Sequence, residues 1–156
     1  MKTVYKVLAY VVAAEVVVQA MLMVFAIAGL GKWVDGGGVL DKAAMESEQS
    51  PFPEVVGFIL HGLNGGIVIP GLALLLLICS FFAKVPGGVK WAGLVLLLVV
   101  VQVNLGYAGH DIPALGAVHG LNALALFSTA FYTARRSRLV AASPTAEASE
   151  HLVTSA

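Results

Sequence analysis

The 156-residue chain is poor in charged residues and has a single cysteine. Asp, Glu, Lys and Arg make up only 12% of the residues, roughly half the share that soluble domains carry. The lone Cys79 excludes an internal disulfide. Hydrophobic residues make up 59% of the chain, so little sequence remains for a domain outside the apolar segments. These shortages exclude an ordinary soluble domain and favour an integral membrane protein, whose main partner is the lipid bilayer and not nucleic acid.

Four long segments are nearly free of charge, and each is long enough to cross a hydrocarbon core of about 30 Å as a helix. We therefore predict an all-α integral membrane fold, an antiparallel bundle of four transmembrane helices in one domain over residues 1–138. The expected helices cover residues 4–28, 54–83, 89–108 and 112–135. Residues 139–156, rich in Ala, Ser, Thr and Glu, are predicted to form a disordered cytoplasmic tail.

Glycine, proline and aspartate indicate where these helices end or bend. The tripeptide Gly29–Gly31 is expected to end the first helix. Gly65, Gly66 and Pro70 predict a bend near the middle of the second helix. Asp111 is expected to cap the start of the fourth helix.

Basic residues are unevenly distributed among the helix ends. They flank the N-terminus, the second connection and the C-terminal end, at Lys2, Lys6, Lys84, Lys90, Arg135, Arg136 and Arg138. The first and third connections are mainly acidic. The positive-inside rule therefore predicts a multi-pass protein of the bacterial plasma membrane with both termini in the cytoplasm.

The first apolar segment also resembles a cleavable signal peptide, because Lys2 and Lys6 precede it and the tripeptide Ala26–Ala28 ends it. However, the segment is long for the apolar part of a signal peptide, and Glu15 interrupts it. Carboxylates inside membrane helices usually have a function. We therefore expect the segment to be retained as the first transmembrane helix.

Two short sequences occur twice and in the same order. Residues 16–19 and 99–102 both read VVVQ, and residues 61–64 and 119–122 both read HGLN. This order indicates a duplicated helical hairpin. A parallel repeat of this kind predicts a pseudo-two-fold axis along the membrane normal.

His61 and His119 are predicted to lie at the same depth on two parallel helices. His61 follows Glu54 by seven residues and His119 follows Asp111 by eight, so both rings lie roughly 10–12 Å below the helix ends at 1.5 Å per residue. The second and fourth helices are diagonal neighbours in a square bundle, and their imidazoles are therefore expected to face each other across its centre. This arrangement suits one haem iron bound from both sides by neutral imidazole.

Small and amide residues surround both histidines. Glycine and alanine leave room for a flat ring, whereas Asn and Gln offer hydrogen bonds to it or to the histidines. The expected cofactor-binding residues besides the two ligands are Gly57, Gly62, Gly65, Gly116, Gly120, Ala123, Asn64, Asn122, Gln19 and Gln102. Glycines also allow close helix packing, and buried His, Asn and Gln side chains also join membrane helices by hydrogen bonds. Glu15, expected nearer the cytoplasmic end and away from the histidine level, is a candidate proton relay, quinone contact or hydrogen-bonding residue.

The stretch VVVQVNLGYAGHDIPALGAVHGLNALALF, residues 99–127, resembles the third and fourth helices of a bundle in the haem A synthase family. That family is built from duplicated four-helix bundles with histidines on the second and fourth helices of each. The resemblance implies a ligand role for His61 and His119. It also implies a packing role for Gln102, Leu105 and Gly106.

The chain spans one bundle, half the length of that family, and it departs from the family on the second helix. Phe58 and Gly62 stand where the family has glutamate and arginine. Small four-helix b-type membrane cytochromes look similar. We therefore expect a membrane b-type cytochrome that binds one haem b and carries electrons to or from a quinone or a redox protein. The sequence leaves two alternatives open: a haem A synthase-like or quinone-oxidising enzyme, and a haem-free scaffold or proton-linked transporter.

Overall fold

The computed structural model describes residues 1–47 and 49–139, and these residues form helices and turns but no strand. The long helices are α1 (Lys2–Asp35), α4 (Ile69–Ala83), α5 (Gly88–Asp111) and α6 (Pro113–Leu139). The short elements are α2 (Lys42–Glu46), the 3-10 turn η1 (Pro53–Val55), α3 (Val56–Leu63) and the π-helical turn η2 (Asn64–Val68). Residues 140–156 of the predicted tail lie outside the described residues.

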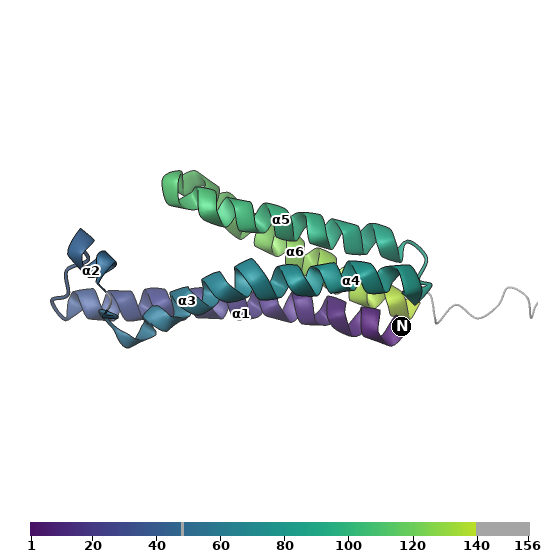
Figure 1. Ribbon diagram of the computed structural model, residues 1–156, viewed down its shortest axis with the longest axis horizontal. Helices are drawn as coiled ribbons and strands as arrows, with labels where there is room; N and C mark the ends of the chain where they lie inside the picture. Colours follow the sequence, from purple (N-terminus) through teal and green to yellow (C-terminus); the bar gives the residue numbers. More distant parts are fainter. Residues whose placement is uncertain (48, 140–156) are drawn as a thin grey trace, which may run out of the picture.

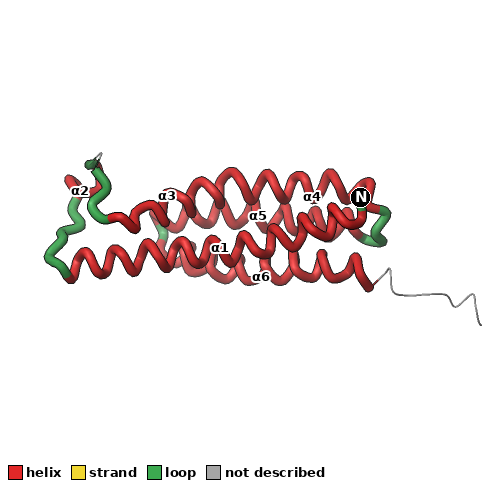
Figure 2. The backbone as a smooth tube through the Cα atoms, turned by 90° about the horizontal axis from the view of Figure 1, so that it is seen from below, coloured by secondary structure: helices red, strands yellow, loops and turns green. Residues whose placement is uncertain are grey.

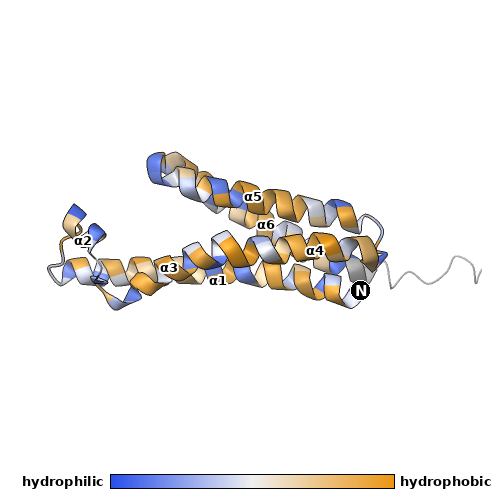
Figure 3. Cartoon of the chain, viewed as in Figure 1, coloured by the Kyte–Doolittle hydropathy of each residue, from blue (hydrophilic) through white to orange (hydrophobic). Residues whose placement is uncertain are grey.

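Four helical segments are long and apolar enough to cross a membrane: Lys2–Asp35, Pro53–Ala83, Gly88–Asp111 and Pro113–Arg136. They pack as a ring, in which α1 contacts α4, α4 contacts α5, α5 contacts α6, and α6 contacts α1 (Figures 1 and 2). The two segments that carry HGLN are thus diagonal neighbours. Figure 3 shows mainly hydrophobic residues along α4 and α5, with hydrophilic residues at the α5–α6 turn. The predicted all-α architecture with four membrane-length helices is confirmed.

The buried core fills one half of this bundle. We call its end the termini end, because the N-terminus lies there beside the α4–α5 turn (Figure 1). The core cluster consists of Tyr5, Ala9, Val12, Ala13, Ile69, Ala73, Leu76, Ala83, Val85, Ala92, Val95, Val99, Leu126, Ala130 and Ala134. The alanines among them let the helix backbones approach closely, as in other membrane-type bundles. Every residue of this cluster lies on the termini side of the two histidines.

Two hydrogen bonds close the termini end. The buried Tyr5 hydroxyl of α1 donates to the Gly88 carbonyl oxygen at 3.1 Å. The Arg136 Nε of α6 donates to the Pro86 carbonyl oxygen at 3.2 Å. The first and last helices, α1 and α6, are therefore hydrogen-bonded to the turn between α4 and α5 or to the residue directly after it.

The opposite end, which we call the loop end, is more open. The α5–α6 hairpin diverges there from α1 and α3 (Figure 1). Helix α3 packs on α1 instead, and a Cβ added at Gly57 would lie 2.6 Å from the Leu22 carbonyl oxygen. Glycine at this position therefore permits the close contact between α1 and α3.

The expected end of the first helix was wrong, because α1 continues past residue 28 to Asp35. Gly29 does not break the helix. It packs against Glu54, whose side chain fills the position that a Cβ would take. One turn later Trp33 packs on Phe52, with ring centroids 5.6 Å apart. These tertiary contacts stabilise the extra turns, and they override the helix-breaking tendency of glycine.

Where a bend was predicted, the second segment contains the π-helical turn η2. The N–H of Ile69 bonds to the carbonyl oxygen of Asn64, five residues earlier, directly before Pro70. The expected cap at the fourth helix was wrong, because Asp111 ends α5 and α6 begins at Pro113. Proline suits this first helical position, since the N–H it lacks would be unpaired there.

Candidate functional site

His61 on α3 and His119 on α6 lie beside each other between the diagonal segments. Their ring centroids are 6.2 Å apart and the ring planes are inclined by 56°. Both side chains are half-buried. The expected approach of the two rings across the bundle is therefore present.

Each ring is fixed in the same way. The Nδ1 atom of His61 lies 3.2 Å from the Gln19 carbonyl oxygen, and that of His119 lies 2.9 Å from the Gln102 carbonyl oxygen. A carbonyl oxygen only accepts hydrogen bonds, so Nδ1 carries the proton in both rings. In a neutral imidazole this leaves a lone pair on Nε2. Both rings are thus held in the tautomer that binds a metal through Nε2.

These two contacts use the repeated sequences, because Gln19 and Gln102 each end a VVVQ tetrapeptide. Gln19 and Gln102 were expected to offer hydrogen bonds to the histidines or to the cofactor. In the structure the backbone carbonyls of both glutamines lie at the Nδ1 atoms, and the Gln102 amide also contacts His119. The asparagines of the two HGLN tetrapeptides also reach equivalent places, four residues before each glutamine. Asn64 Nδ2 donates to Glu15 Oε2 at 2.7 Å, and Asn122 Nδ2 donates to the Leu98 carbonyl oxygen at 3.0 Å.

The two glutamine amides differ. Gln102 Nε2 donates to His119 Nε2 at 3.1 Å, and its Oε1 accepts from Asn122 at 2.6 Å. The Gln19 amide is buried, and neither its nitrogen nor its oxygen has a hydrogen-bond partner in the described part of the chain. Leaving a buried amide without a partner costs free energy. The NH2 group and the oxygen of Gln19 could therefore donate to and accept from a molecule bound beside the histidines.

The glycines near the histidines fall into two groups. A Cβ at Gly106 would lie 3.2 Å from His119 Cε1, and a Cβ at Gly65 would lie 3.2 Å from Gln19 Nε2, so these two glycines support the site by close packing. Gly57 belongs to the α1–α3 contact described above. The other candidates have open space or partial exposure: no atom lies within 4 Å of a Cβ added at Gly62, Gly116 or Gly120, and Ala123 is half-buried.

The distance between the two ring centroids is close to that of two imidazoles bound to one metal from opposite sides. A bond from a metal to an imidazole nitrogen is about 2.0 Å long, and with about 1.2 Å from that nitrogen to the ring centre, two such ligands have centroids about 6.4 Å apart. Among the described residues no group of three or more His, Cys, Asp or Glu side chains comes together.

Comparisons with family models, with curated proteins and with solved structures found no match to this chain.

Glu15 was expected away from the histidine level, and the structure corrects this. Its carboxyl group is joined to the site through Asn64. The sequence carried a signal for this placement, since Glu15 precedes Gln19 by four residues and therefore lies on the same face of α1. An estimate of depth from the number of residues along each helix does not reveal this contact, because the Asn64 side chain extends to the neighbouring helix α1.

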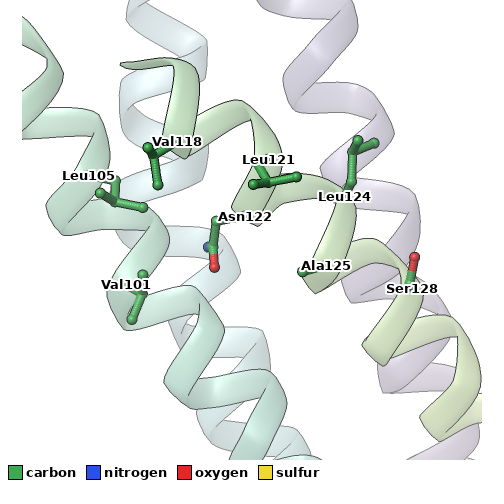
Figure 4. A pocket seen from close by; sticks show the side chains of 8 residues that line it. All are labelled: Val101, Leu105, Val118, Leu121, Asn122, Leu124, Ala125 and Ser128. Carbon is green, nitrogen blue, oxygen red and sulfur yellow. The ribbon is translucent and has the colours of Figure 1, made fainter. Parts of the chain in front are cut away.

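Asn122 connects the site with a groove between α5 and α6. The groove has a volume of about 520 Å³. Its lining is apolar apart from two side chains, and consists of Val101, Leu105, Val118, Leu121, Asn122, Leu124, Ala125 and Ser128 (Figure 4). The Asn122 amide thus faces this groove while it donates a hydrogen bond to Gln102.

Proposed function

We propose that this chain is an integral membrane protein that holds one haem b between His61 and His119 and carries electrons. The observation that carries the proposal is the matched pair of rings, 6.2 Å apart, each with Nδ1 bound to a backbone carbonyl. Bound in this way, a haem supplies a one-electron couple. Because both histidines would serve as ligands, they would leave no position at the metal for a substrate, and electron transfer is favoured over substrate chemistry. The resemblance of residues 99–127 to a haem A synthase bundle agrees with this role.

The residues around the ligands have distinct tasks. The carbonyls of Gln19 and Gln102 orient the rings and make Nε2 a better donor to a metal. The unpartnered Gln19 amide is placed to hydrogen-bond a polar substituent of the cofactor. The two HGLN segments would place equivalent side chains on the two sides of the haem.

The charge distribution supports a membrane orientation. The termini end carries the basic residues Lys2, Lys6, Lys84, Lys90, Arg135 and Arg136. The loop end carries mainly acidic side chains. We propose that both termini lie in the cytoplasm of a bacterial cell and that the histidines lie nearer the outer face of the plasma membrane.

A membrane quinone is the proposed electron-exchange partner, with a redox protein as the alternative. The apolar groove between α5 and α6 lies along membrane-length helices and has Asn122 in its lining. Asn122 is joined to His119 through Gln102. A quinone headgroup in this groove would therefore lie close to the ligand side chains.

Spectroscopy of the purified protein tests the haem assignment. We expect a red protein with a low-spin b-type spectrum, and we expect either His61→Ala or His119→Ala to abolish that spectrum. His110→Ala is the matched control, because His110 is exposed at the end of α5 and the hydrogen bonds and ring contact of His61 and His119 involve other residues. A colourless protein from haem-replete cells, or a bis-histidine spectrum that survives either ligand substitution, would disprove the proposal.

One observation favours a haem-free alternative. Gln102 Nε2 donates to His119 Nε2, so the side chains of this half are hydrogen-bonded without any cofactor. Together with Glu15 and Asn64 they would form a polar seam for proton-linked transport. Proton flux into vesicles with a colourless protein would support this alternative.

A further inference from the structure

Glu15 breaks the correspondence between the two halves of the site. In the sequence repeat, Leu98 precedes Gln102 by four residues, and Glu15 precedes Gln19 by the same four. In one half the backbone carbonyl of Leu98 accepts the asparagine hydrogen bond, and in the other half the Glu15 carboxyl accepts it. A backbone carbonyl is therefore sufficient for this structural role, and a carboxyl group is not needed to hold Asn64.

A carboxyl group in this position is also costly. It lies near the middle of a membrane-length helix, where a charge without a partner is unfavourable. The one ion pair among the described residues is Lys42–Glu46, in the connection after α1. Glu15 Oε2 accepts from Asn64, while Oε1 has no hydrogen bond in the described part of the chain. A carboxyl group that packing does not require, at a place where a backbone carbonyl would serve, points to a chemical role for this side chain.

We propose that Glu15 is the proton acceptor coupled to the oxidation state of the haem site, an inference that rests on the proposed function. When an outside one-electron donor reduces the site, the Glu15 carboxylate takes up one proton from water and forms one O–H bond. The added electron is thereby compensated by a positive charge. On oxidation the electron passes to the acceptor, the O–H bond breaks and the proton returns to water. Asn64 keeps the carboxyl group beside the helix that carries His61.

Other titratable groups face this region from the neighbouring helices. His61 lies on α3 and His119 on α6, and both are assigned as ligands. Tyr107 lies on α5, with its hydroxyl 3.9 Å from the position that a Cβ would take at Gly66 in η2. The remaining tyrosines and the cysteine of the membrane-length helices lie toward the termini end. Tyr107 is therefore the other titratable side chain whose contribution the test must separate from that of Glu15.

The test is the pH dependence of the midpoint potential of the haem-loaded protein. With one proton per electron, the equilibrium constant for reduction changes tenfold per pH unit across the titrating range, which is about 59 mV for a one-electron couple. We expect Glu15→Gln to abolish this dependence. Tyr107→Phe and Asp111→Asn are the controls and are expected to retain it, since Asp111 is an exposed carboxylate at the end of α5.

The outcomes separate this inference from the proposed function. A haem-loaded wild-type protein whose potential does not change with pH overturns the inference alone. A dependence that persists in Glu15→Gln places the proton on another group and overturns it as well. A colourless protein overturns both proposals.

If the Glu15→Gln variant does not fold, infrared difference spectra of the haem-loaded wild-type protein, reduced minus oxidised, test the inference instead. A protonated-carboxyl band that grows on reduction, and that shifts when the protein carries carbon-13-labelled glutamate, supports the inference. The absence of a labelled band overturns it.

Discussion

Gly106→Ala should weaken haem binding by displacing the His119 ring. A Cβ at this position would lie 3.2 Å from His119 Cε1 and 3.3 Å from Nδ1. Comfortable carbon–carbon contacts are about 3.5–4.0 Å, so the ring must move by a few tenths of an ångström. That movement strains the hydrogen bond from Nδ1 to the Gln102 carbonyl oxygen, which is 2.9 Å long.

The magnitude follows from two terms. Loss of the orienting hydrogen bond costs about 1 kcal/mol. Overpacking of a close contact costs about 1 kcal/mol at the low end of its range. The sum of about 2 kcal/mol corresponds to haem affinity about 30-fold weaker. This value lies within the roughly 10–100-fold losses seen when groups that orient metal ligands are changed.

Titration of the haem-depleted protein with haem, followed by absorbance, measures this effect. Gly93→Ala is the matched control, because it lies on the same helix and no atom lies within 4 Å of its added Cβ. Both substitutions remove the same helix-interior glycine penalty of about 1 kcal/mol, so their stability gains should be similar. Equal haem affinity in the two variants would refute the reasoning about the ring contact.

Two further substitutions separate the fold from the site. Tyr5→Phe removes the hydrogen bond to Gly88 and should lower the free energy of unfolding by about 1 kcal/mol, measured with denaturant in detergent, while the haem spectrum stays unchanged. A spectral change would show that the closed end and the site are coupled. Gln102→Leu removes the donor that occupies His119 Nε2, so haem should bind about fivefold more tightly, since one hydrogen bond contributes about 1 kcal/mol. Gln19→Leu should leave His119 unaffected, because the Gln19 amide has no hydrogen bond in the described part of the chain. A gain in haem affinity in that variant would contradict the idea that the Gln102 amide competes with haem for His119 Nε2.

Much of the fold could be predicted from the sequence, because four apolar runs of membrane length leave few alternatives. The position of the interruption in the second helical segment also followed from the local sequence, since Gly65, Gly66 and Pro70 lie in or next to the π-helical turn. The end of α1 did not follow. Gly29 has the same local preference whether or not Glu54 packs against it, and that contact joins residues 25 positions apart.

The sequence predicted the level of the two histidines along their helices, but it did not predict which atoms form their hydrogen bonds. Counting 1.5 Å per residue brings His61 and His119 to one level, because both follow their helix starts by similar distances. The contacts of the His119 ring depend on its rotamer, which is set by packing, so the sequence could not show that its Nδ1 meets the backbone carbonyl of Gln102 and its Nε2 the Gln102 amide. The Glu15–Asn64 contact was missed for the same reason, since side chains of that length reach a full turn beyond their own level.

The alanine-rich core at the termini end has a consequence for biogenesis. All of its buried residues lie on the same side of the two histidines. Hydrogen bonds also join α1 and α6 to Gly88 and Pro86, at the turn between α4 and α5. We therefore expect the half at the termini end to assemble first, and the half that carries the histidines to be completed last. On the proposed function, the haem would then bind after the helices have inserted into the bilayer and packed together.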